Sequence, residues 1–217
     1  AYSGCNGINP YSKDSPTVQP ISVNDEFILF PAGNVTSNNE LWRSDGTEEG
    51  TYMVKDINPP ASNGDEKDSN PSHLNHVADN KVIFRATDGW GAHDYELWIT
   101  DGTEEGTQLL KDINPGTDTS NAQWFTMMDD IYYFRADDGD YGEELWRTDG
   151  TTNGTYRVTD LFYEYGDGVL SPALPFGDVL VFRGDMSGSS CHPDCTGMEL
   201  YKYNPSTNET TIIKDFE

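Results

Sequence analysis

The chain has 217 residues, 12% of them aromatic, and it carries 38 acidic against 13 basic residues, which gives a formal net charge of −25. A charge this negative argues against nucleic acid or an anionic membrane surface as a partner, and the aromatic content is too high for an acidic disordered chain. The sequence contains no run of about 18 apolar residues, so no segment is predicted to insert into a membrane.

One motif recurs along the chain. It begins with Glu-Leu-Trp and is followed two residues later by Asp-Gly-Thr, and it starts at Glu40, Glu96 and Glu144, with a degenerate Glu-Leu-Tyr at Glu199. Successive starts lie 56, 48 and 55 residues apart, which is the length of a four-stranded propeller blade. Because no segment shows a helical period, we predict an all-β protein, a β-propeller of four four-stranded blades.

The strands of each repeat are predicted in the same order. A loosely alternating first strand, such as 73–78, ends at a two-residue turn, and an apolar second strand follows at 27–30, 82–85, 131–135 and 179–183. The third strand starts at Glu-Leu-Trp. The fourth follows the Asp-Gly-Thr turn, at 51–57, 107–113, 155–161 and 210–216. The blades are therefore expected at about 17–59, 71–115, 120–163 and 170–217 of a single domain over 1–217.

The N-terminal residues 1–16 resemble the end of a blade. Gly7-Ile8-Asn9-Pro10 matches Asp56-Ile57-Asn58-Pro59, and the sequence stops at Lys214-Asp215-Phe216-Glu217, about where the same ending belongs. A chain that begins where its last repeat leaves off fits a closed ring of blades, although a piece of a longer tandem array would look the same. We predict the closed ring.

The full motif, Glu-Leu-Trp-x-x-Asp-Gly-Thr-x-x-Gly-Thr followed by Lys-Asp-Ile-Asn-Pro, resembles the ELWxxDGT repeat proteins of secreted and cell-surface chains. The resemblance covers nearly the whole chain and implies an extracellular repeat architecture of β-propeller type, with no defined reaction. The first repeat departs from the pattern at Pro31, where the others have Arg. The fourth departs at Tyr201 and lacks the Asp-Gly-Thr turn.

The polar residues of the motif have two possible interpretations. Asp45, Asp101 and Asp149 fall between two strands, where Asp can accept hydrogen bonds within its own turn. The arrangement is also similar to the Asp-box turn of sialidase-like propellers. We favour turn chemistry over a binding role for these carboxylates.

Arginine ends three of the second strands, and glutamate begins the third strand that follows. We expect each arginine to pair with its glutamate across the antiparallel ladder, in the pairs Arg85 with Glu96, Arg135 with Glu144, and Arg183 with Glu199. A catalytic arginine cluster, as in sialidases, is the alternative.

Tryptophans and their neighbours provide candidates for ligand contact. Trp42, Trp98 and Trp146 recur in register and are expected in the core or between blades. Trp90 and Trp124 have no counterparts. Trp90, which lies between two glycines, is the leading candidate for stacking on a sugar or a partner, with burial by its own loop as the alternative. The other candidate ligand-binding residues are Trp124, Tyr141 and His93.

One face of the predicted propeller collects the irregular segments. Loops between second and third strands are expected on the same face as the links between blades, and we call this side, with residues 58–70, 88–94, 137–143 and 191–195, the variable face. Because binding residues concentrate in loops on a rigid scaffold, we expect the variable face to engage the partner.

The segment 137–143 is a candidate calcium site. Asp137, Asp138, Asp140 and Glu143 offer hard carboxylate oxygens at short spacing, with glycines for tight turning. The spacing is not that of an EF-hand, and a solvated acidic loop is the alternative. We predict no other cofactor.

The cysteines and sequons indicate a secretory route. Cys191 and Cys195 are predicted to form a disulfide, with Cys5 as an alternative partner for either, because a zinc site that included His192 would lack a fourth ligand. Candidate glycosylation sites are Asn34, Asn153 and Asn208. A chain that begins at Ala1 is expected to be a mature product after signal-peptide removal.

Two functions of different classes follow from these patterns. No hydrolase elbow, zinc-protease helix, P-loop or dinucleotide fingerprint is present. The sequence therefore favours a secreted or cell-surface, non-catalytic module that engages a glycan, a protein or copies of itself. A propeller enzyme acting on glycans is the alternative. Such an enzyme needs acids on the innermost strands, and the predicted innermost strands contain none.

Overall fold

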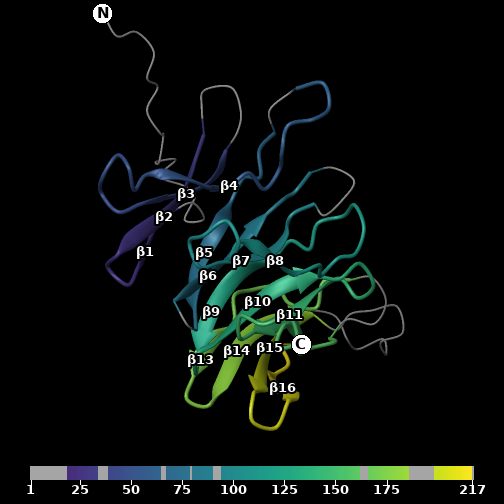
Figure 1. The fold of residues 1–217 in the computed structure, drawn as a ribbon. Helices are drawn as coiled ribbons and strands as arrows, with labels where there is room; N and C mark the ends of the chain where they lie inside the picture. The colour runs from purple at the N-terminus through teal and green to yellow at the C-terminus, as the bar shows by residue number, and fades with distance from the viewer. Residues whose placement is uncertain are drawn as a thin grey trace, which may run out of the picture. The chain divides into compact units, whose positions relative to one another are not determined.

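The computed structural model describes residues 19–33, 39–64, 67–78, 80–89, 94–161, 166–185 and 198–216. Within these ranges sixteen strands form four four-stranded antiparallel sheets, and the strands of each sheet pair in chain order (Figure 1). The prediction of an all-β propeller with four four-stranded blades is confirmed. In the part of the chain that is described, no helix has the length and apolar character needed to cross a membrane.

The four sheets are blades 1 to 4. Blade 1 contains β1 (Ile21–Val23), β2 (Phe27–Ala32), β3 (Glu40–Ser44) and β4 (Tyr52–Lys55). Blade 2 contains β5 (Ser72–Val77), β6 (Lys81–Ala86), β7 (Glu96–Thr100) and β8 (Gln108–Lys111). Blade 3 contains β9 (Gln123–Met128), β10 (Ile131–Asp137), β11 (Glu143–Thr148) and β12 (Tyr156–Arg157). Blade 4 contains β13 (Leu174–Phe176), β14 (Val179–Asp185), β15 (Met198–Asn204) and β16 (Glu209–Lys214).

Two local features fix the strand ends. The predicted two-residue turns of blades 1 and 3 have positive φ at both positions, 51° and 58° at Asn24 and Asp25 and 52° and 60° at Asp129 and Asp130, a geometry that Asn and Asp tolerate and that matches the twist of a hairpin. The fourth strands are shorter than predicted. In blade 3 the Leu145 carbonyl accepts hydrogen bonds from the N–H groups of both Val158 and Thr159, and this bulge ends β12 early.

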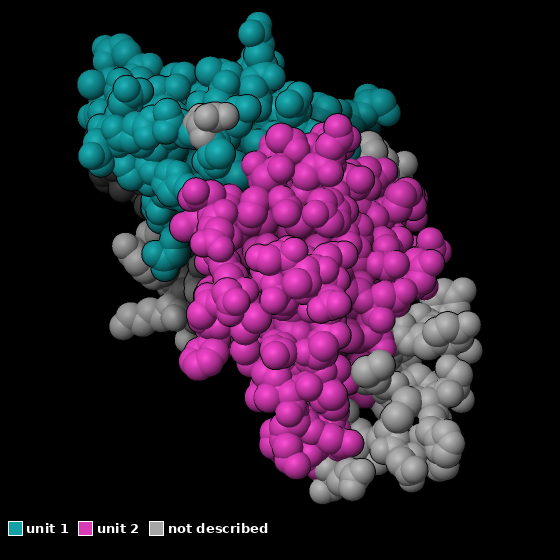
Figure 2. Space-filling view, turned by 90° about the horizontal axis from the view of Figure 1, so that it is seen from below, with its two compact units in different colours: residues 1–110 teal, residues 111–217 magenta. Residues whose placement is uncertain are grey.

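The chain divides into two compact units, coloured separately in Figure 2. Unit 1, residues 1–110, comprises blade 1 and blade 2 as far as Leu110, and unit 2, residues 111–217, comprises Lys111, the last residue of β8, together with blades 3 and 4. Ring closure depends on how the two units are placed, and it stays a prediction.

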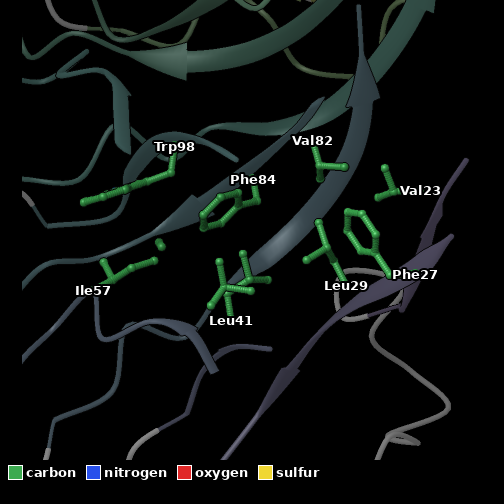
Figure 3. Packing of buried hydrophobic residues seen from close by; sticks show 10 residues of the cluster. Val23, Phe27, Leu29, Leu41, Ile57, Val82, Phe84 and Trp98 are labelled. Atoms are coloured by element: carbon green, nitrogen blue, oxygen red, sulfur yellow. The ribbon is translucent and has the colours of Figure 1, made fainter. Parts of the chain in front are cut away.

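The core of each unit lies between its two blades. We call the side of a blade that packs toward the next blade in the chain its forward face, and the other side its reverse face. In unit 1 the forward face of blade 1 meets the reverse face of blade 2 in one cluster, made of Val23, Leu29, Leu41, Val54 and Ile57 on one side and Val82, Phe84, Ala86 and Trp98 on the other (Figure 3). Burying each large apolar side chain contributes roughly 1.5–3 kcal/mol, so this packing dominates the stability of the pair.

Unit 2 repeats this arrangement. The forward face of blade 3 packs on the reverse face of blade 4, through Met128, Tyr133, Leu145 and Leu161 on one side and Leu180, Phe182, Tyr201 and Tyr203 on the other. The recurring tryptophan is buried, as predicted, at Trp98 and Trp146. Trp42, on the reverse face of blade 1, is only half-buried.

Candidate functional site

The repeated aspartates are held inside their own turns. Oδ1 of Asp45 accepts hydrogen bonds from the Thr47 N–H (2.9 Å) and the Thr47 hydroxyl (2.7 Å), and the Gly50 N–H donates to that hydroxyl oxygen (2.9 Å). The turns at Asp101 and Asp149 repeat these bonds at 2.6–3.0 Å. The Thr47 hydroxyl and N–H hold the pKa of Asp45 below its ordinary value. Turn chemistry is confirmed for all three carboxylates.

The glutamates that start the first three motifs, Glu40, Glu96 and Glu144, are fully buried, and Glu40 shows how such a carboxylate clamps two blades. Oε2 of Glu40 accepts the Ile57 N–H (3.1 Å) and the Ser69 hydroxyl (2.5 Å), while its Oε1 accepts the Ser69 N–H (3.0 Å). Burial raises the pKa of Glu40, and the hydrogen bonds from Ser69 and Ile57 oppose that rise. Since Ile57 follows the last strand of blade 1 and Ser69 precedes the first strand of blade 2, this carboxylate ties the two blades together.

Blade 3 builds the same clamp with a different donor. Oε1 of Glu144 accepts the Leu161 N–H (2.9 Å), and its Oε2 accepts the Thr159 hydroxyl (2.6 Å). Gly168 lies so close that a Cβ atom there would come within 2.0 Å of Oε1. A serine like Ser69 does not fit at this position, and Thr159 supplies the hydroxyl instead. The motif glutamates are therefore scaffold residues.

The strand register does not place the predicted arginine–glutamate partners directly opposite each other across the ladder. The strand register sets Arg85 opposite Leu97, Arg135 opposite Leu145, and Arg183 opposite Leu200. Successive side chains of a strand point to opposite sides of the sheet, so Glu144 points away from Arg135. Arg135 instead forms an ion pair with Glu143, the residue before the motif glutamate.

The loops of the variable face and the links between blades lie on one side within each unit. A Cβ atom on Gly89 would come within 2.8 Å of Asn58 Oδ1, and one on Gly139 within 2.7 Å of Asn114 Oδ1. Each glycine belongs to a loop between the second and third strands, and each asparagine to a link. The predicted sharing of one face by loops and links is confirmed for these described segments.

A pocket of about 510 Å³ opens on the variable face of unit 1. It is lined by Asn39, Asn70, Pro71, Ser72, Arg85 and Tyr95. The guanidinium of Arg85 lies 4.5 Å from the centre of the Tyr95 ring, and Asn39 Nδ2 donates a hydrogen bond to Asn70 Oδ1 (3.1 Å). Burial lowers the pKa of Arg85, while Tyr95, Asp94 and Glu96 oppose this shift. Aromatic, amide, hydroxyl and cationic groups therefore converge on one hollow.

Sequence reasoning missed most of this pocket, although one signal was available. Tyr95 precedes Glu96 just as Glu143 precedes Glu144. In blade 3 the arginine of the same position pairs with Glu143 and lies 3.9 Å over the Trp124 ring. Blade 2 has Tyr95 in place of that carboxylate, and this difference between aligned repeats marks the pocket.

The acidic loop is held together by hydrogen bonds and arginines. Oδ1 of Asp137 accepts the Gly139 N–H (2.8 Å), and Oδ1 of Asp138 accepts the N–H groups of Asp140 (3.2 Å) and Tyr141 (3.1 Å). Asp138 Oδ2 lies 3.4 Å from Arg157 Nη1. Burial raises the pKa of Glu143, and Arg135 opposes that rise. Among the described residues no three His, Cys, Asp or Glu side chains are grouped to hold a metal, and calcium stays a prediction.

Some of the other predicted site residues lie within the ranges that the structure describes, and some lie outside them. Trp124 is half-buried with Arg135 over its ring, and Tyr141 is 40% exposed with the Arg157 guanidinium 3.6 Å above its ring. The structure does not bring either into the Arg85 pocket lining. Asn153 and Asn208 are exposed. The predictions that fall outside the described residues are Trp90, His93, Cys5, Cys191, Cys195 and Asn34.

Comparison with known proteins supports the fold and goes no further. No family model matches the chain, and no curated protein matches it. A mutant puromycin hydrolase is similar over 93% of this chain and 29% of its own, at 14% identity and a TM-score of 0.53. An acylaminoacyl peptidase of Pyrococcus horikoshii is similar over 91% of this chain and 27% of its own, at 10% identity and a TM-score of 0.50. This chain thus spans under a third of either protein.

Proposed function

We propose that this chain is an extracellular, non-catalytic binding or assembly module whose variable face engages a glycan, a protein or copies of itself. One observation carries the proposal: the repeated polar residues are committed to the scaffold. Glu40 accepts hydrogen bonds from Ile57 of its own blade and from Ser69 of the link, and Glu144 accepts them from Thr159 and Leu161 at the end of its own blade. The three motif aspartates accept hydrogen bonds from their own turns. These carboxylates, whose recurrence in the repeats would suggest chemistry, therefore serve the fold.

The first strands also favour binding over catalysis. Sheet pairing places β1, β5, β9 and β13 at one edge of their blades, and none of these strands contains Asp or Glu. A propeller glycosidase needs a pair of carboxylates flanking the scissile bond. The location outside the cell is supported by the exposed sequons at Asn153 and Asn208 and by the resemblance to ELWxxDGT repeat proteins.

The Arg85 pocket is the best-described part of the variable face, and we propose a glycan as its ligand. Binding pockets combine apolar or aromatic surface with a few placed polar groups. Here the Tyr95 ring offers a surface for a sugar ring, while Asn39, Asn70 and Ser72 offer amide and hydroxyl groups for sugar hydroxyls.

A glycan array with three proteins tests this proposal. We expect the wild type to bind a restricted set of glycans and Tyr95→Ala to lose at least tenfold in affinity, which corresponds to about 1.4 kcal/mol. Tyr52→Ala removes an exposed tyrosine of the same unit outside the pocket, and it should bind as the wild type does. Equal binding by Tyr95→Ala would contradict the pocket, and cleavage of a bound glycan seen by mass spectrometry would favour the enzyme.

A further inference from the structure

The arginine at the end of the second strand has a carboxylate partner in blade 3 and lines a pocket in blade 2. Arg135 forms an ion pair with Glu143, the residue before the motif glutamate of its blade. Arg85 is its counterpart in blade 2, since the register sets both arginines opposite the leucine of the motif. Tyr95 holds the position of Glu143 there, and it lines the pocket together with Arg85. Blade 3 therefore shows which chemical group an arginine at this position binds.

The pocket lining is positive in a chain that is strongly negative. Among the described residues that line it, Arg85 is the one charged side chain, and the other polar lining groups are amides and hydroxyls. Asp94 and Glu96 oppose the effect of burial on the Arg85 pKa, but neither of them lines the pocket. Because Arg85 is half-buried, water screens its attraction for an anion less than it would at an exposed site.

A guanidinium can bind a carboxylate and still keep its contacts within the protein. It carries five N–H donors in a planar fork that matches the two oxygens of a carboxylate. In blade 3 the Arg135 guanidinium lies 3.9 Å over the Trp124 ring, and its Nη1 donates to the Val169 carbonyl (3.4 Å). It forms the ion pair with Glu143 in addition to these two contacts. Arg85 can bind a carboxylate in the same way while it keeps its own ring contact.

We propose that the Arg85 pocket recognises the carboxylate of an acidic sugar, such as a uronic acid, within a glycan. The carboxylate binds the Arg85 guanidinium as the Glu143 carboxylate binds Arg135, and the amide and hydroxyl groups of the lining bind sugar hydroxyls. The inference rests on the proposed glycan function and names the class of glycan. Since the chain carries a net charge of −25, it repels a polyanion at long range, so we expect an acidic sugar that stands among neutral ones.

A glycan array on which each acidic glycan stands beside its carboxyl-reduced counterpart tests the inference. Reduction converts the carboxylate into a CH₂OH group and leaves the rest of the glycan unchanged, so each pair isolates one group. The assay is run at 0.15 M salt, where charges more than about 8 Å apart are largely screened. We expect the wild type to bind the acidic member of a pair about tenfold more tightly than the neutral member.

Two pairs of variants connect this preference to the arginine. Arg85→Gln should remove the preference, whereas Arg183→Gln, which changes the exposed arginine at the same position of blade 4, should leave it unchanged. Tyr95→Glu should also remove it, because the new carboxylate would pair with Arg85 as Glu143 pairs with Arg135. Tyr95→Gln has the same size without the charge, so it should weaken binding of both members and keep the preference. Circular dichroism checks the fold of each variant, and the Tyr95 pair decides the matter even where Arg85→Gln does not fold.

The outcomes separate this inference from the proposed function. Equal binding of acidic and carboxyl-reduced glycans by the wild type would overturn the inference and leave the proposed glycan ligand standing. A preference for the acidic member that persists in Tyr95→Glu would overturn it as well, since the carboxylate would then be bound elsewhere. Tighter binding of sulfated glycans than of carboxylate-bearing ones would also contradict it. A wild type that binds no glycan of any kind would contradict the proposed glycan ligand and the inference together.

Discussion

The carboxylate of Asp45 occupies the space that a side chain on Gly50 would need. A Cβ atom built on Gly50 would lie 2.0 Å from Asp45 Oδ1, and Gly106 and Gly154 meet Asp101 and Asp149 at the same 2.0 Å. The second glycine of the motif is therefore required by the approach of the aspartate. Spacing and residue type in the repeat follow from one turn geometry.

Gly50→Ala should destabilise the protein by displacing the Asp45 carboxylate. We expect a cost of roughly 1–3 kcal/mol, as for overpacking of a filled site. In an Asp45→Gly background the same substitution should cost less, since the clash is gone. Denaturant unfolding of the two single variants and the double variant measures this coupling energy. Additive costs would show that Gly50 is required for another reason.

Glu144→Gln should destabilise unit 2 because an amide NH₂ replaces one of two accepting oxygens in a buried clamp. We expect a loss of roughly 1–3 kcal/mol for the donor left without an acceptor. Glu199→Gln is the matched control, since Glu199 is only half-buried and accepts the Phe216 N–H at 2.7 Å in blade 4. Thermal unfolding should show a clearly smaller drop in Tm for this control, and equal drops would contradict the clamp.

The stability of unit 1 should depend on pH through His73. Burial, aided by the positive charge of Arg85, lowers the pKa of His73 to about 4 from its ordinary 6.5. The unfolded chain then binds more protons than the folded chain between these values. The free energy of unfolding should therefore fall as pH drops from 6.5 toward 4, by at most about 1.4 kcal/mol per pH unit from this residue.

His73→Asn isolates that contribution. Asn tolerates the positive φ of 55° at this position, and the variant should show a shallower loss of stability over the same pH interval. His76→Asn removes an exposed histidine from the same strand and is the matched control. Denaturant titrations at several pH values give the comparison, and identical slopes for His73→Asn and wild type would rule out this role.

Arg157→Gln should strengthen calcium binding to the acidic loop. Arg157 pairs with Asp138 at 3.4 Å, so calcium must displace this arginine to use that oxygen. Arg147→Gln, which removes a pairing with Asp149 at 3.8 Å in the same blade, should leave binding unchanged. Isothermal titration with and without chelator measures both. If calcium produces no heat of binding with the wild type, Arg157→Gln or Arg147→Gln, the prediction of a calcium site is wrong.

The blade order and most strands were predictable because each motif residue answers a local requirement. The turn between the third and fourth strands requires Asp and Gly. The junction between two blades requires a buried hydrogen-bond acceptor, which the motif glutamate provides. Both requirements recur with the period of the repeat. The arginine partners were not predictable from the spacing alone, since a shift of one residue, from Glu144 to Glu143, changes the side of the sheet.

The pocket was harder to predict because it joins distant parts of unit 1. Asn39 and Tyr95 lie in different blades, and only packing brings them to one lining. The comparison between repeats contained the clue, because blade 2 has Tyr95 where blade 3 has the carboxylate of Glu143. At positions where otherwise aligned repeats differ, the residue is therefore not determined by the requirements of the blade structure.

The buried clamp has a consequence for how such a chain can be divided. Glu40 accepts hydrogen bonds from the Ile57 N–H of its own blade and from the Ser69 N–H of the link to the next blade. A blade excised before that link would lose the N–H and hydroxyl donors of Ser69, and its forward face would lose the apolar cover of the next blade. We therefore expect the smallest fragment able to fold by itself to be a pair of blades with the intervening link, with cooperativity between neighbours as in other repeat proteins.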